Sequence, residues 1–116
     1  MKAAVINLYI EQGTDWTHKI RYWTDTARTV PVDFSGATGA CKIRDMDGKI
    51  VASPVVTFEA GTIVLAMSHT VTSGIVVDGV SYDQTTDCTY DVEVTSAGVT
   101  QRWANGVATI SPEVTK

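Results

Sequence analysis

Hydrophobic and polar residues alternate in short runs along most of the chain, the pattern of β-strands with one buried and one solvent-facing side. In residues 16–23, Trp16 and Ile20 point to one side while Lys19 and Arg21 point to the other. This run is predicted to be a half-buried strand. Trp23 breaks the alternation, because it falls on the polar side or just beyond the end of the strand.

Turn residues separate these runs and predict β-hairpins. Asp47-Gly48 joins strands expected near residues 40–45 and 49–53, and both turn residues tolerate the positive φ of a type I′ turn. The segments VVTFE and TIVLAM form a second pair that turns at residues 60–61. Residues 88–106 predict a third hairpin, in which Tyr90, Val92 and Val94 share one face.

Other segments lack this alternation. Residues 24–39 are predicted to be a loop with Val32 and Phe34 turned inward. SHTVTSG is expected to form one helical turn, with Ser68 as its N-cap and Gly74 at its end. A second Asp-Gly, at residues 78–79, indicates a small hairpin or a loop. The whole pattern is typical of an all-β sandwich or barrel.

The chain has 116 residues, which predicts a single domain over residues 1–116. The formal net charge is −4, and the basic residues form no run, so a nucleic-acid partner is not expected. No stretch approaches the roughly 18 apolar residues of a membrane span, so a membrane partner is not expected either.

No residue pattern for catalysis, cofactor binding or metal binding stands out, so the protein is not expected to be an enzyme. The two histidines, His18 and His69, are isolated in the sequence. The two cysteines, Cys41 and Cys88, are predicted to be buried thiols on neighbouring strands, with a disulfide as the alternative.

The three tryptophans are the most informative large side chains. Trp16 and Trp103 are expected in the core, whereas core and interface are equally plausible for Trp23. An exposed Trp23 beside Tyr22 or Tyr82 would also suit sugar stacking, so a glycan- or ligand-binding module is one alternative function.

The order of several motifs is more specific than any one of them. A Gln12-Gly13 turn precedes the strand that ends at Trp23, and VDFSG, GTIVLAMS, YDVEV and GVATISPEVT follow in that order. In this order the chain resembles the small immunoglobulin-like structural proteins associated with the tails and baseplates of tailed bacteriophages. It is similar to the N-terminal domain of phage baseplate upper proteins.

This resemblance implies an immunoglobulin-like antiparallel β-sandwich of about seven to nine strands, with a short helical turn near residues 68–73. It also implies a virion structural protein of the tail or neck, made in the bacterial cytoplasm, that attaches to other tail, collar, baseplate or fibre proteins in many copies. No fibre region follows Lys116, so a single-domain adaptor is expected. A capsid decoration or head-fibre protein is the alternative.

Two segments are the candidate partner-binding residues. The first is Trp23. The second is the polar, proline-broken tail of Ser111, Pro112, Glu113 and Val114. The last strands are expected to lie near a sheet edge, where unpaired backbone groups can bind a partner.

Overall fold

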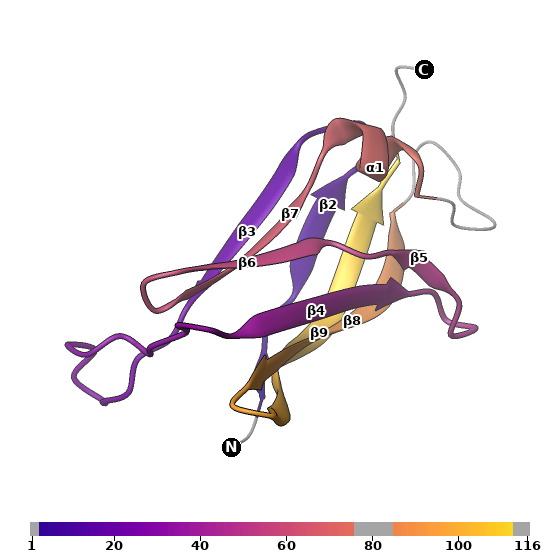
Figure 1. Ribbon diagram of the computed structural model, residues 1–116. Helices are drawn as coiled ribbons and strands as arrows, with labels where there is room; N and C mark the ends of the chain where they lie inside the picture. Colours follow the sequence, from indigo (N-terminus) through magenta and orange to yellow (C-terminus); the bar gives the residue numbers. More distant parts are fainter. Residues whose placement is uncertain (1–2, 76–84, 113–116) are drawn as a thin grey trace.

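The computed structural model describes residues 3–75 and 85–112, which form two β-sheets packed face to face (Figure 1). The larger sheet has the spatial order β1 (Ala4–Val5), β9 (Val99–Ser111), β8 (Thr86–Ser96), β4 (Thr38–Arg44) and β5 (Ile50–Ala52), and β2 (Leu8–Glu11) also pairs with β9. The smaller sheet has the order β3 (Trp16–Arg21), β7 (Thr62–Met67) and β6 (Val55–Glu59).

This strand order is that of an immunoglobulin-like sandwich, so the predicted fold class is confirmed. In the letters used for immunoglobulin domains, β3, β7 and β6 are strands B, E and D, and β9, β8, β4 and β5 are strands G, F, C and C′. The pairings are antiparallel except at one place, where β1 and β2 run parallel to β9.

Alternating side chains from both sheets fill the core. The predicted inward face of β8 is confirmed, because Tyr90, Val92 and Val94 are all buried. Cys41 and Cys88 are buried, free thiols on the neighbouring strands β4 and β8, as predicted, and no disulfide joins them. Cys41 pairs with Val92 rather than with Cys88, so the two thiols do not lie opposite each other.

The hairpin at Asp47-Gly48 is present, but its predicted turn type is wrong. Gly48 has a φ of 84°, and its N–H donates to the carbonyl of Asp45 at 3.0 Å. The Asp45 carboxylate accepts the N–H groups of Asp47 and Lys49, each at 3.0 Å. This is a type I turn followed by a glycine bulge. Type I′ geometry occurs instead at Ala97-Gly98, where φ is 52° and 78°.

The predicted helical turn is confirmed as α1 (His69–Ser73). The Ser68 hydroxyl accepts the N–H of Val71 at 3.3 Å, and the chain leaves the helix at Gly74. The Thr72 hydroxyl accepts the N–H of Gly13 at 3.1 Å, which ties α1 to the β2–β3 turn. The second Asp-Gly, at residues 78–79, lies outside the described residues, as does Tyr82.

The last strand lies near the edge of its sheet, as expected, but it is not the edge strand itself. β9 pairs with β8 on one side and with β1 and β2 on the other, because the first strands of the chain add parallel to it. Ser111 lies opposite Glu11, and its carbonyl accepts the N–H of Gln12 at 2.9 Å.

Candidate functional site

The two segments expected to bind a partner lie at opposite ends of the sandwich. The molecule is 44 Å long and about half as wide. Trp23 follows β3 at the end that carries the β6–β7 turn, whereas Ser111 ends β9 beside Gln12 and α1. Glu113 and Val114 lie outside the described residues, so the structure presents Trp23 but only the start of the tail.

The loop after Trp23 projects from its end of the sandwich (Figure 1) and is internally ordered. Trp23 forms a backbone bridge with Pro31, and Thr24 N–H donates to Val30 carbonyl at 2.8 Å. The Asp25 carboxylate accepts the N–H groups of Thr29 at 2.9 Å and Val30 at 3.1 Å. Hydrogen bonds, first from the Thr29 hydroxyl, lower the pKa of Asp25. The carboxylate that organises the loop therefore stays ionised at neutral pH.

The returning segment of this loop is held against the β6–β7 turn. Tyr22 donates its N–H to the Gly61 carbonyl at 2.8 Å and accepts the N–H of Val32 at 3.1 Å. Gly61 has a φ of 66°, and a Cβ placed there would lie 2.4 Å from the Cβ of Pro31. Only a glycine allows this close approach, so the turn and the loop share one packed surface.

An aromatic cluster of Tyr22, Phe34, Phe58 and Trp103 packs beneath this surface. Tyr22 packs edge-on against Trp103 with ring centroids 5.0 Å apart, and its hydroxyl donates to the Trp103 carbonyl at 2.8 Å. Phe34 lies 5.2 Å from Trp103 and 5.1 Å from Phe58. Burial raises the pKa of Tyr22 to about 12. Tyr22 is therefore partly buried in this cluster, and sugar stacking beside Trp23 stays a prediction.

Two adjacent hollows make up the exposed part of this end, which we name the Pro31 surface. They have volumes of about 430 and 370 Å³ and share Pro31, Glu59, Ala60 and Gly61. The first is also lined by Val32, Asp33, Phe34, Ser35 and Phe58, and the second by Arg21, Tyr22, Trp23 and Thr62. Trp23 and Val30 are 39% and 52% exposed.

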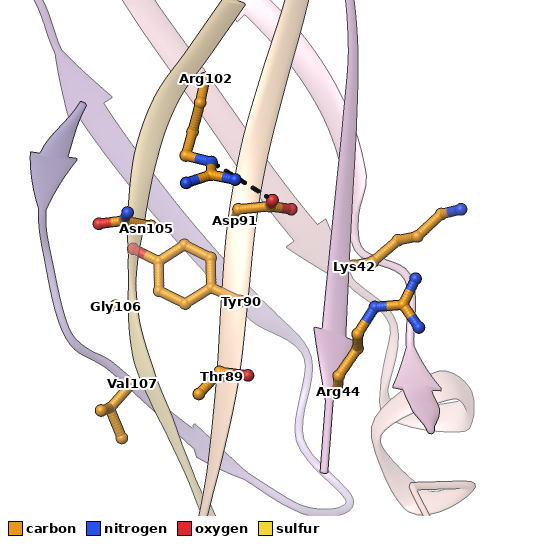
Figure 2. Close-up of a pocket in the computed structure, with 9 residues that line it drawn as sticks. All are labelled: Lys42, Arg44, Thr89, Tyr90, Asp91, Arg102, Asn105, Gly106 and Val107. Carbon is orange, nitrogen blue, oxygen red and sulfur yellow. Dashed lines mark ion pairs between the residues drawn. The ribbon is translucent and has the colours of Figure 1, made fainter. Parts of the chain in front are cut away.

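A third groove, of about 430 Å³, lies on the outer face of the larger sheet (Figure 2). Arg102 from β9 and Asp91 from β8 form an ion pair across it at 3.5 Å. Lys42 and Arg44 from β4 line its other side, and Arg44 donates to the Gly48 carbonyl at 2.8 Å. The polar, partly charge-paired lining is that of a solvated sheet face.

Both histidines make local contacts. His18 stacks on Trp16 with ring centroids 6.2 Å apart, and burial lowers its pKa. His69 contacts Asp15 at 3.0 Å through a ring nitrogen. Within residues 3–75 and 85–112, no cluster of three or more His, Cys, Asp or Glu residues could hold a metal ion. In the same ranges, no helix is long and apolar enough to cross a membrane.

No protein-family model matches this sequence, and no curated protein is found to be similar to it. The geometry of the Pro31 surface is therefore the main guide to function. Trp23 could be selected from the sequence because it breaks the alternation of its strand. Asp33, Phe58 and Gly61 could not, because the loop that holds Asp33 and the β6–β7 hairpin that holds Phe58 and Gly61 meet only in the folded chain.

Proposed function

We propose that this protein is a virion structural domain of a tailed bacteriophage that attaches to another tail, collar, baseplate or fibre protein through the Pro31 surface. The virion context rests on the resemblance of its motifs to small tail-associated sandwich proteins. The immunoglobulin-like fold is consistent with that context but is shared by many unrelated functions.

One observation carries the interaction role: an exposed tryptophan on an ordered loop, beside two hollows with partly apolar lining. Tryptophan is enriched among the residues that dominate binding energy at interfaces, and such residues sit in or beside well-packed pockets. The Asp25 hydrogen bonds and the packing of Pro31 on Gly61 order the loop before a partner arrives. Less conformational entropy is then lost on binding.

Many copies in one particle would strengthen such an interface. Binding sites presented together on a symmetric virion act at high effective concentration, so a modest contact at each copy suffices. Ser111 lies at the other end of the domain, and the tail of Ser111, Pro112, Glu113 and Val114 remains a candidate for a second contact.

Immunogold electron microscopy of gradient-purified particles, with antibody against this chain, tests the virion role. Label at the tail, neck or baseplate supports the proposal. Label over the head would replace it with capsid decoration. Absence from particles, with the chain present in the lysate, would refute both.

Rebinding to particles that lack the protein tests the surface. We expect Trp23→Ala to lower rebinding at least about tenfold, the loss typical of a dominant interface residue. Tyr9→Ala is the matched control, because Tyr9 is also an exposed aromatic residue, 56% exposed, on β2 of the other sheet. Equal losses for the two variants would count against the Pro31 surface.

A further inference from the structure

The hollow on the Asp33 side of the Pro31 surface combines an apolar floor with acidic groups. Phe34, Phe58, Pro31 and Val32 supply apolar lining, and Asp33 and Glu59 are its charged residues. No basic residue lines this hollow, all of whose lining residues lie in the described part of the chain. The second hollow, beside Trp23, differs because Arg21 lines it.

The aromatic floor suits a cation with an apolar stem. The rings of Phe34 and Phe58 are tilted by 30°, with their centroids 5.1 Å apart. Phe34 is buried, while Phe58 is only partly buried and remains accessible in the hollow. A cation above an aromatic face is attracted to it, and long basic side chains lay their methylene groups along apolar surface while their charged ends stay hydrated.

The carboxylates of Asp33 and Glu59 make few contacts within the chain. Asp33 accepts the N–H of Ser35 at 2.9 Å, and hydrogen bonding by the Ser35 hydroxyl and N–H lowers its pKa. Glu59 contacts the Lys19 ammonium at 3.3 Å, but both side chains are at least half exposed. Such exposed pairs are weak and exchange readily with solvent or with another cation.

We propose that this hollow binds an arginine side chain of the partner, with its methylene groups on Phe58 and Pro31 and its guanidinium at Asp33 and Glu59. This inference rests on the proposed function, since it names the kind of side chain that the Pro31 surface receives. Arginine fits better than lysine because its planar guanidinium makes paired hydrogen bonds to carboxylates and also stacks on aromatic rings.

Lys19 then competes with the partner's arginine for the Glu59 carboxylate. Replacing it with methionine keeps the apolar stem and removes the ammonium that holds Glu59. The inference therefore predicts a variant that binds better than the natural chain. A solvated surface without this specificity would show no such gain.

Nuclear magnetic resonance titration of the full chain with N-acetyl-arginine amide tests the site. We expect the amide signals of Asp33, Ser35, Phe58 and Gly61 to shift, less with the lysine analogue and not with the citrulline analogue, which has the same shape without charge. Asp33→Asn should weaken arginine binding about fivefold, and Lys19→Met should strengthen it about twofold to fivefold. Asn retains the oxygen that accepts the Ser35 N–H.

Asp87→Asn serves as the control, because this exposed carboxylate lies on the other sheet, where it accepts the Thr109 hydroxyl at 2.9 Å. Equal shifts with the citrulline analogue, no shifts at these residues, or equal weakening by Asp33→Asn and Asp87→Asn would each overturn the inference. Particle labelling reports on the proposed function separately. Arginine specificity in the absence of label would keep the site and refute only the virion role.

Discussion

The contact between Pro31 and Gly61 gives the sharpest test of how the loop after Trp23 packs on the β6–β7 turn. Gly61 and Gly98 both lie in hairpin turns with positive φ, at 66° and 78°. A Cβ at Gly61 would lie 2.4 Å from the Pro31 Cβ and 3.3 Å from the Tyr22 carbonyl oxygen, whereas nothing lies within 4 Å of a Cβ at Gly98. Comparing alanine substitutions at Gly61 and Gly98 separates the free-energy cost of the positive φ from the cost of the clash with Pro31.

Gly98→Ala should lower the free energy of unfolding by about 1–2 kcal/mol, the cost of placing a side chain in the left-handed region. Gly61→Ala carries the same cost and adds overpacking against Pro31, which is about 1–3 kcal/mol. The total for Gly61→Ala is therefore about 2–5 kcal/mol. Either loss is a large fraction of the stability of a small domain.

Urea unfolding of the two variants and the natural chain measures these free energies. The slope of the unfolding free energy with urea should stay the same, so that the midpoints report stability. In the Gly61→Ala variant the amide signals of Val32 and Tyr22 should also shift, because their hydrogen bonds join the loop to the turn. Equal losses of stability in the two variants would show that Pro31 does not rest on Gly61 and would refute the packing of the loop on the β6–β7 turn.

Three further predictions test other parts of the fold. Ala97→Asn should raise the free energy of unfolding by about 0.5–1 kcal/mol in urea unfolding, because asparagine tolerates the φ of 52° that Ala97 adopts in its type I′ turn; an unchanged midpoint would contradict this. Burial raises the pKa of Cys41 to about 12 and also raises that of Cys88. Both thiols should therefore resist a disulfide reagent at pH ~8 in the native protein and react once it is unfolded; rapid native reaction would refute their burial. Hydrogen bonds from the backbone and ring of His69 lower the pKa of Asp15, so its contribution to stability is present above the ordinary aspartate pKa and is lost as the pH falls. Asp15→Asn should flatten the dependence of stability on pH between about pH 5 and about pH 2, and an unchanged profile would contradict this.

The parts of the fold that the sequence predicts well are those determined by neighbouring residues. The alternation in residues 90–94 identifies the inner face of β8, and Ser68 and Gly74 bracket α1. The Asp-Gly pair predicts the position of the turn at residues 47–48 but not its geometry, since Asp45 accepts two N–H groups and favours a type I turn with a glycine bulge. A dipeptide alone does not contain that information.

Long-range pairing explains what the sequence does not predict. Ala4 pairs with Ala104, and nothing in the alternation of either strand indicates that the two run parallel. The loop of residues 24–37 has no period, because its order comes from one carboxylate, Asp25, and from a contact with Gly61. Trp23 was recognisable as an exception, whereas Asp33 and Phe58 acquire a role only when the sheets pack.

The parallel pairing of β2 with β9 gives the domain a direction in which it resists pulling. Leu8 to Glu11 lie beside Ala108 to Ser111, and the two strands lead away from the pair at opposite ends. A force applied between Ala4 and Ser111 acts along both strands, so the hydrogen bonds between them carry the load together and must rupture together. In an antiparallel hairpin pulled from its open end the bonds would break one after another. The pairing of the four residues of β2 with β9 thus acts as a mechanical clamp between the two ends of the domain.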